Sequence, residues 1–401
     1  MRTSLHVFEI HSIIRLRGEG MGFLRSIGNY FKTTEKIYWL IALTISAYSL
    51  LLMKTLPVKS YFMTMLVAVV IGYAGAVIIT LIDYHDLSSI WYIIALLCVF
   101  LMLYTLKFGN AVTNTGGVNA KAWIKLGSTS FQPSELVKIG FMITFSKHLS
   151  TLQERDLLKS PLHIVLLAVH ALIPIGLTQL QGDTGAGIIF FCMFLAMAFG
   201  AGIQLRYFVA LFAVIGAAFP LLWKYVMPDY QKERMLVAYQ LDTTDSSMQA
   251  AAWQQKQART SIGSGGIWGR GLFHAPRVAS KIVPEYDSDM IFSTAGEELG
   301  FIGCCLIILL LLFLLWRTLR IARKSPDLLG SSICMGFFGM IAAQMIFNIG
   351  MCVDLLPVMG VTLPFFSKGG SSAACIYFGI GLVENVHMHP LNPTKVSIRL
   401  S

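Results

Sequence analysis

Long apolar runs that carry almost no charge recur along the whole chain. An α-helix needs about 20 residues to cross a bilayer, and ten runs approach or reach that length. They occupy residues 37–54, 61–82, 87–106, 135–147, 162–178, 185–204, 207–226, 290–316, 328–355 and 369–387. Hydrophobic residues make up 55% of the 401 residues and charged residues only 13%. The sequence therefore predicts an all-α polytopic membrane protein with about ten transmembrane helices.

The apolar runs form one block that no Pro/Gly/Ser-rich linker divides. We therefore expect one transmembrane domain over residues 37–387, flanked by tails at 1–36 and 388–401. The one large stretch between runs, at about 227–289, separates the seventh run from the eighth. Residues 4–14 could form a short interfacial helix or part of an unstructured tail.

Basic residues predict the orientation of this domain. If the N-terminus is inside, the inside segments carry more than twice as many Lys and Arg residues as the short outside loops. Because cytoplasmic loops are enriched in these residues, both termini should be cytoplasmic and residues 227–289 should lie outside.

The expected outside stretch is itself basic. Its Lys and Arg residues are Lys232, Arg234, Lys256, Arg259, Arg270, Arg277 and Lys281. They could be ordinary solvated charge that is attracted to anionic headgroups, or they could bind the phosphates of a phosphorylated lipid. Charge alone favours neither interpretation.

All seven cysteines fall within the apolar runs, and none lies in residues 227–289. A disulfide framework or a cysteine-based metal site is therefore not expected. Apolar packing is the default role of a buried cysteine.

The sequence PEYDSDMIF at Pro284–Phe292 places carboxylates at the start of the eighth apolar run. A carboxylate in a membrane segment persists mostly where it is paired, lines a cavity or takes part in chemistry. If the helix includes residue 289, Asp289, Ser293 and Glu297 share one face at spacings of four. We expect that polar face to point into the protein.

A second polar group lies at the start of the fourth run. Pro133 fits the first turn of a helix, and Glu135 suits the positive end of that helix. Glu135 and Lys138 are three residues apart and can pair on one face. Such a pair could simply fix the helix entry, or it could belong to a functional site.

Three further polar stretches allow both structural and functional interpretations. Asp183 precedes the sixth run and could cap its helix. Residues 261–271 hold five glycines, which let backbone N–H groups approach a ligand but are as common in turn-rich linkers. Residues 356–372 hold two prolines and three glycines, which predict a tightly folded segment that shapes the wall of an outer cavity.

Four strings, in this order, resemble the shape, elongation, division and sporulation (SEDS) family, whose members include RodA and FtsW. They are QPSE at 132–135 with Lys138, QxD at 181–183, IGSGG at 262–266 and LPFFSKGGSS at 363–372. The resemblance covers about residues 110–386. The ten apolar runs and the long stretch before the eighth are similar to the family's architecture.

The resemblance implies a peptidoglycan glycosyltransferase of the bacterial cytoplasmic membrane. Such an enzyme polymerises lipid II at the outer face and releases undecaprenyl diphosphate. The implied partners are lipid II, membrane lipids and a class B penicillin-binding protein that crosslinks the strands, with no nucleic acid. The family's essential aspartate matches Asp289 rather than Asp287, so Asp289 is the expected general base.

Further site candidates come from the same strings and from the outer stretch. The expected substrate-binding residues are Lys121, Gln132, Glu135, Lys138, Asp183, Ser264 and Lys281. The expected residues of the cavity wall are Glu297, Pro364, Ser367, Gly369, Gly370 and Ser371. Cations must offset the charge that builds on the leaving diphosphate. A divalent cation, Mg²⁺ or Mn²⁺, could share that task, although the sequence shows no ligand set for it.

The chain departs from the family pattern at four positions. Asp287 stands in place of the usual His, Lys368 in place of Tyr, Ala122 in place of Arg, and Asp354 in place of a common Gly. A second carboxylate two residues from Asp289 should raise the pKa of Asp289 by like-charge repulsion. We expect Asp287→His, which restores the family residue, to be tolerated.

Two other classes of function fit some of these features. A flippase or other lipid transporter would also use ten spans and interior carboxylates, but transport predicts polar residues that continue into the cytoplasmic half. A non-catalytic scaffold for a penicillin-binding protein would not need Asp289. Polymerisation of purified lipid II, with and without Asp289→Asn, separates all three.

Overall fold

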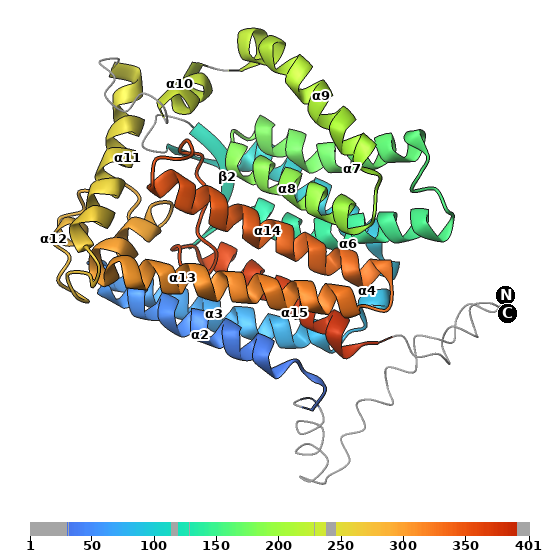
Figure 1. Cartoon of the computed structure of the whole chain (residues 1–401), viewed down its shortest axis with the longest axis horizontal. Helices are drawn as coiled ribbons and strands as arrows, with labels where there is room; N and C mark the ends of the chain where they lie inside the picture. The colour runs from blue at the N-terminus through green and yellow to red at the C-terminus, as the bar shows by residue number, and fades with distance from the viewer. Residues whose placement is uncertain are drawn as a thin grey trace.

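The computed structural model describes residues 30, 32–113, 119–127, 129–227, 229–237 and 246–390. Residues 4–14 and most of the two expected tails lie outside these ranges. The described chain forms a bundle of helices with one small sheet (Figure 1). The helices are α2 (Lys36–Thr55), α3 (Lys59–Thr80), α4 (Tyr84–Ser89), α5 (Trp91–Phe108), α6 (Pro133–Glu154), α7 (Pro161–Leu180), α8 (Thr184–Gly200), α9 (Leu205–Leu221), α10 (Asp229–Val237), α11 (Ser246–Gly265), α12 (Pro276–Ala279), α13 (Ile291–Lys324), α14 (Leu328–Cys352) and α15 (Gly370–Met388).

Each predicted apolar run has its helix, and seven helices of the described chain are long and apolar enough to cross a membrane. These seven are α2, α3, α5, α7, α13, α14 and α9 with its π-helical continuation η2 (Leu222–Val226). The helix α8 is apolar but shorter. The structure thus confirms an all-α polytopic membrane protein, while the count of ten spans stays a prediction.

Several helix boundaries differ from the predicted runs, among them the end of the eighth run, which continues as α13 to Lys324. The third run breaks at Ile90, where the short helix α4 ends and α5 begins at Trp91. The fourth continues seven residues beyond its predicted end at residue 147, to Glu154. Hydropathy locates the apolar middle of a helix, and polar residues at its ends escape that signal.

The interior of the bundle is formed mainly by α6, α14 and α15, which bury side chains on most of their surface. The helix α14 packs against α8 and α13, and α15 packs against α3. By contrast, α9 buries no residue, and α5 buries only Met102 and Thr105. A helix that is apolar on its exposed face belongs against lipid, and α9 lies along the margin of the molecule in Figure 1.

A three-stranded antiparallel sheet precedes α6 and was not predicted from the sequence. It consists of β1 (Asn110–Thr113), β2 (Asn119–Leu126) and β3 (Thr129–Phe131), in the order β1-β2-β3. Asn110 pairs with Trp123, and Ile124 pairs with Phe131. The strands are short and lie between two long helices, so an alternating pattern had few residues in which to appear.

More than half of the described residues in the stretch at 227–289 lie in the helices α10, α11 and α12. Its glycine-rich part ends α11 and packs on the backbone of α13. A Cβ on Gly265 would lie 2.0 Å from the carbonyl oxygen of Gly296, and one on Gly269 would lie 2.2 Å from that of Glu298. These glycines therefore permit close helix packing, which the interpretation as a ligand loop or a linker did not anticipate.

The helix α13 is kinked at the same contact. Gly300 has φ 67° and ψ −164° inside the helix, a conformation open essentially to glycine. The backbone N–H of Phe301 donates to the carbonyl of Gly266, and that of Ile302 donates to the carbonyl of Ile267. The turn after α11 thereby supplies acceptors for two backbone N–H groups that lose their partners within the helix at the kink.

The elements that carry most site candidates meet at one end of the bundle. We call this the sheet end: it holds the sheet, α10 to α12, the starts of α6, α13 and α15, and residues 353–369 (Figure 1). The opposite end holds α4 and the turn between α13 and α14.

Candidate active site at the sheet end

The first turns of α6 hold a buried ion pair. Pro133 occupies the first turn, and the Nζ atom of Lys138 lies 2.8 Å from Oε2 of Glu135. Lys138 is 1% exposed and Glu135 is 6% exposed. Burial makes each charge depend on the other, because an unpaired ion in this setting is costly. The geometry therefore fits the interpretation that this pair fixes the start of the helix.

Asp183 joins this ion pair to the turn between α7 and α8. Its Oδ1 accepts the backbone N–H of Ala186 at 3.0 Å, so it caps α8 as one interpretation of the sequence proposed. Its Oδ2 accepts Nε2 of Gln132 at 2.7 Å. Lys138 and Glu135 lie close enough to influence the ionisation of Asp183. Gln132, Glu135, Lys138 and Asp183 therefore form one polar group, which we call the α6 cluster.

Lys121 lies on β2 beside the same turn. Its backbone N–H donates to the carbonyl of Gln181 at 2.9 Å, and its side chain is exposed. Gln181 in turn donates its Nε2 to the carbonyl of Met102 on α5 at 2.8 Å. The sheet thus places a solvated cation next to the α6 cluster.

Asp289 lies in a turn and not on the helix. The helix α13 begins at Ile291, so the expected helical face shared by Asp289, Ser293 and Glu297 is wrong for Asp289. The carbonyl of Glu285 accepts the N–H groups of Ser288 and Met290, at 3.1 Å and 2.9 Å. Those hydrogen bonds form a compact turn. Residue 289 therefore lies before the first turn of α13 and does not share its helical register.

Groups from α14 and from the segment after it hold the backbone of Asp289. Nδ2 of Asn348 donates to the carbonyl of Asp289 at 2.8 Å and to that of Val361 at 2.7 Å. The carboxylate of Asp289 faces Gly360, because a Cβ on that glycine would lie 3.7 Å from Oδ2. The half-buried Asp289 therefore sits between its own turn and residues 360–361.

Residues 367 and 368 fasten the same turn from the other side. Oγ of Ser367 donates to the carbonyl of Ser288 at 2.7 Å and accepts the N–H of Leu363 at 2.7 Å. Lys368 binds Asp287 twice, through its backbone N–H and through Nζ. Three consecutive residues of the turn are thus held by partners that follow them by 59 to 81 positions in the chain.

Residues 359–361 lie between the α6 cluster and the turn that carries Asp289. A Cβ on Gly185, two residues after Asp183, would lie 2.5 Å from the carbonyl oxygen of Met359. The other side of this short segment faces Asp289 through Gly360. The α6 cluster and Asp289 thus flank one segment at the sheet end, although a shared substrate cavity stays a prediction.

Three further candidates come from neighbouring elements: Glu297 from α13, Ser264 from α11 and Lys281 from the residues after α12. Glu297 is fully buried and accepts the backbone N–H of Arg277 at 2.9 Å, which ties α12 to α13. Ser264 donates to the carbonyl of Ser261 on its own helix, at 2.9 Å. Lys281 is exposed after α12 and has φ 51°. Glu297 thus has a structural contact, whereas substrate binding by Ser264 and Lys281 stays a prediction.

The other expected wall residues surround the start of α15. Pro364 is buried, and Gly369 and Gly370 form the N-terminal boundary of the helix. Oγ of Ser371 accepts the backbone N–H of Gln132 at 3.3 Å. Ser371 therefore links the start of α15 to the start of α6.

Sequence reasoning did not single out Tyr61 or Arg277 as site residues. Nζ of Lys368 lies 3.6 Å from the ring centroid of Tyr61, at the start of α3. Arg277 donates its Nε to Oγ of Ser261 at 2.9 Å. Tyr61 precedes Lys368 by more than 300 residues in the chain and gave no local signal, whereas Arg277 was one of several similar cations.

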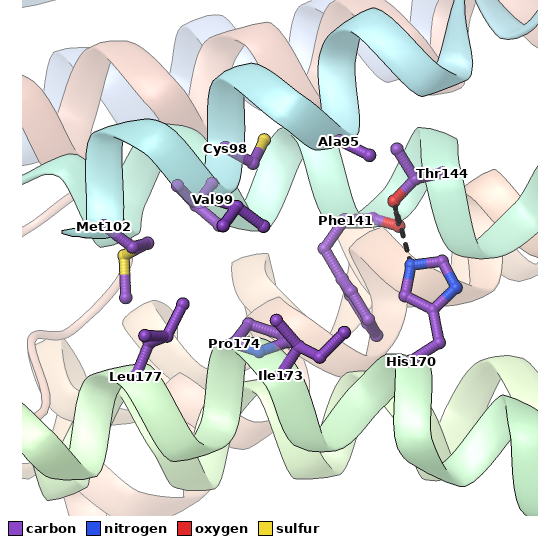
Figure 2. A pocket seen from close by; sticks show the side chains of 11 residues that line it. Ala95, Cys98, Val99, Met102, Phe141, Thr144, His170, Ile173, Pro174 and Leu177 are labelled. Atoms are coloured by element: carbon purple, nitrogen blue, oxygen red, sulfur yellow. Dashed lines mark hydrogen bonds between the residues drawn. The ribbon is translucent and has the colours of Figure 1, made fainter.

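A separate apolar cavity of about 90 Å³ lies between α5, α6 and α7 (Figure 2). Its polar lining comes from Thr144 and His170, whose Oγ1 and Nε2 atoms are 3.4 Å apart. Val99 and Leu177 are among the side chains that point into it (Figure 2), and Cys98 also lines it. Because it has no charged group and room for only a few methylene groups, we do not assign diphosphate binding to it.

Among the described residues, no three His, Cys, Asp or Glu side chains converge as metal ligands. We therefore derive no step through the divalent cation considered above.

The model of a family described as "Cell cycle protein", which joins FtsW, RodA and SpoVE, matches residues 33–391. The chain belongs to this family. Its resemblance to the SEDS family is thereby confirmed over nearly the whole chain.

Similar curated proteins carry related names. Stage V sporulation protein E of Bacillus subtilis (strain 168) is 33% identical over 321 residues, which cover 79% of this chain and 84% of that protein. The peptidoglycan glycosyltransferase MrdB of Escherichia coli (strain K12) is 30% identical over 73% of this chain and 76% of its own length. A probable peptidoglycan glycosyltransferase FtsW of Trichlorobacter lovleyi is also 30% identical, over 86% of this chain and 88% of its own.

Two solved structures share the fold. One is described as the structural coordination of polymerization and crosslinking by a peptidoglycan synthase complex, and it matches with a TM-score of 0.76 and 26% identity. That match covers 88% of this chain and 97% of the other. The other is the rod shape determining protein RodA of Thermus thermophilus, with a TM-score of 0.66 and 25% identity over 90% of this chain and 98% of that one. Together with the apolar helices, these matches identify a multi-pass protein of the inner membrane.

Proposed function

We propose that this protein is a peptidoglycan glycosyltransferase that polymerises lipid II, with Asp289 as its general base. The observation that carries the proposal is the placement of Asp289. Its turn is fixed by Asn348, Ser367 and Lys368, and it lies across residues 359–361 from the α6 cluster. A preorganised carboxylate at the same end as one buried and one exposed cation is the arrangement that glycosyl transfer from a diphosphate requires.

In the proposed reaction, a sugar hydroxyl attacks the anomeric carbon of a lipid-diphosphate donor. The new C–O bond forms as the bond from the anomeric carbon to the diphosphate oxygen breaks. The carboxylate of Asp289 accepts the hydroxyl proton, and the electron pair of the broken bond leaves with the diphosphate. Lys121 and Lys138 are the cations at the sheet end that we propose to offset this charge.

Relatives support both the activity and a partner. MrdB and FtsW relatives are named peptidoglycan glycosyltransferases, and one structural neighbour is a peptidoglycan synthase complex in which polymerization and crosslinking are coordinated. We propose lipid II as the substrate and a class B penicillin-binding protein as the partner of this chain. A non-catalytic scaffold would not require a fixed carboxylate at this turn.

The test is polymerisation of purified lipid II by the protein together with its partner. Asp289→Asn should lower the rate by about 10²–10⁴-fold, the usual contribution of general acid–base catalysis. The variant should insert and fold normally, because Asn keeps the size of the side chain and the backbone carbonyl that accepts Nδ2 of Asn348. A fully active Asp289→Asn enzyme would remove the base assignment.

We further propose one transmembrane domain, with both termini cytoplasmic and the sheet end outside. The bias of basic residues supports this orientation. A cysteine introduced at Ser246 should react with an impermeant thiol reagent in intact cells. Labelling only after lysis would reverse the orientation and place Asp289 on the wrong side for lipid II polymerisation.

A further inference from the structure

Two of the four residues that depart from the family pattern contact each other. Nζ of Lys368 lies 2.9 Å from Oδ2 of Asp287, and the backbone N–H of Lys368 donates to the carbonyl of Asp287 at 2.7 Å. The two residues are 81 positions apart. A residue that is usually His and one that is usually Tyr are thus replaced here by an acid and a base that form an ion pair.

The surroundings of the pair make each partner depend on the other. Asp287 is 7% exposed, so its carboxylate needs a cation to offset lost hydration. The ammonium group of Lys368 also lies over the ring of Tyr61, 3.6 Å from its centroid, which adds a cation–π contact. Burial would lower the pKa of Lys368, but the hydrogen bond and negative charge of Asp287, together with Tyr61, outweigh it and raise that pKa.

The pair acts on the turn that carries Asp289. Lys368 holds residue 287, its neighbour Ser367 holds the carbonyl of Ser288, and Asn348 holds the carbonyl of Asp289. Removing the ion pair leaves residue 287 held to Lys368 only through the backbone N–H of Lys368. The pair also neutralises a carboxylate two residues from Asp289, so the like-charge repulsion expected from the sequence is offset.

We infer that Asp287 and Lys368 form a positioning pair that sets both the location and the charge environment of Asp289. This inference rests on the proposed function of Asp289. Neither residue is a catalytic residue, since their side chains bind each other and act on the reaction through the turn. The two departures from the family pattern are one coupled exchange.

A coupled exchange changes the expectation for Asp287→His. The single substitution puts an imidazole against the ammonium group of Lys368 and removes the carboxylate that binds it. Polymerisation should therefore fall about tenfold, and the earlier expectation of tolerance no longer follows. The double variant Asp287→His with Lys368→Tyr, which supplies both family residues, should recover activity to within about threefold of wild type.

The decisive experiment measures kcat, KM and the pH profile of lipid II polymerisation for Asp287→Asn and Lys368→Met. Both should lower kcat about tenfold and leave KM within twofold, since neither side chain is assigned to the substrate. Around Asp289, titratable groups come from its own turn (Glu285 and Asp287), from Cys352 on α14 and from Lys368.

The two variants should move the acidic limb of the pH profile in opposite directions. A base works when ionised, so the rate rises with pH through the pKa of Asp289. Asp287→Asn leaves an unpaired cation nearby and should move that limb to lower pH, whereas Lys368→Met leaves an unpaired carboxylate and should move it to higher pH, each by about 0.5–1 unit. A purely structural role would shift neither limb.

Controls separate failure of this inference from failure of the proposed function. Asp156→Asn breaks an exposed ion pair with Lys159, which follows α6 at the opposite end, and should leave kcat and the pH profile unchanged. If wild type polymerises and Asp289→Asn does not, but Asp287→Asn and Lys368→Met match wild type in kcat and pH profile, the positioning pair is wrong. If wild type with its partner does not polymerise lipid II, or Asp289→Asn does, the proposed function itself fails.

Discussion

The two ends of the bundle both join distant segments through carboxylates and cations, but they use them differently. At the opposite end, Nδ1 of His85 lies 2.8 Å from Asp83 and Nε2 lies 2.7 Å from Asp327. Asp327 also accepts the N–H of Gly330, which caps α14, and the hydroxyl of Tyr84. At the sheet end, Lys368 binds Asp287, and the side chain of Lys368 is still 37% exposed.

The two ends differ in which groups their contacts hold. Both ring nitrogens of His85 and both oxygens of Asp327 bind protein groups, so that cluster joins α4 to the start of α14. At the sheet end, Asn348 holds the backbone carbonyl of Asp289, and the carboxylate of Asp289 faces Gly360. We call the cluster of Asp83, His85 and Asp327 the His85 lock, whereas the same residue types hold the turn of the proposed base at the sheet end.

Substitution of Lys138 has the largest expected effect. It tests whether the α6 cluster takes part in the reaction or only stabilises the fold, as the His85 lock does. Lys138→Ala should cut polymerisation at least a hundredfold. It leaves Glu135 buried without its cation, so folded yield should also fall, because breaking a buried pair costs about 3–5 kcal/mol. Activity per folded molecule is therefore the quantity to measure.

The double variant Glu135→Gln with Lys138→Met separates the two effects. It removes both charges and keeps similar volumes, so folded yield should recover. Activity should stay low if Lys138 offsets charge on the diphosphate. Recovery of activity together with yield would make the cluster a lock like that of His85, and Lys138 would leave the site.

Gly300 gives the next largest effect, on stability rather than on chemistry. A Cβ at this position would lie 2.2 Å from the backbone N of Gly269, and the residue has φ 67°. Gly300→Ala should therefore destabilise the protein by about 3 kcal/mol or more, by strain and by separation of α11 from α13. Thermal unfolding in detergent measures this loss of stability.

Gly127 is the matched control for this substitution. It has a similar φ of 63° but nothing within 4 Å of its Cβ position. Gly127→Ala should cost only the strain of a left-handed residue, about 1–2 kcal/mol. Equal losses in the two variants would mean that the α11–α13 contact adds no stability to the sheet end.

Hydropathy was sufficient to predict the helices of the bundle, because the apolar requirement of a span is local in sequence. The run at 328–355 and α14 agree within three residues, and the run at 369–387 and α15 within one. The family strings were sufficient to identify Asp289, the α6 cluster and the segment before α15 as candidates. Each of these inferences depends on residues that are neighbours in the chain.

Contacts between distant segments could not be predicted in this way. The spacing of Asp289, Ser293 and Glu297 fits a helix, but spacing does not reveal that the helix begins only at Ile291. The partner of Asp287 lies 81 residues away. Similarly, five closely spaced glycines show that the backbone must be approached closely, but not that the approaching group is another helix.

The smallest effect concerns the pH dependence of the lock at the opposite end. Burial would lower the pKa of His85, but its hydrogen bonds to Asp327 and Asp83 and the negative charges of these residues outweigh it and raise the pKa to about 9. A raised pKa means that protonated His85 stabilises the folded state fully below its unfolded value of about 6.5, and that this contribution is lost as pH rises to about 9. After discounting for solvent screening, the loss should be roughly 1–2 kcal/mol.

His85→Gln removes this titration and shows whether the lock is what the pH acts on. Between pH 6.5 and 9.5, the melting temperature of wild type should fall more steeply than that of His85→Gln, whose lower stability should vary little over the same range. The ratio of polymerisation rates at matched folded fractions should be the same for both proteins, because His85 lies at the end away from Asp289. Parallel melting curves for the two proteins would show that His85 is not protonated in the lock, and a change in the rate ratio would show that the two ends are coupled.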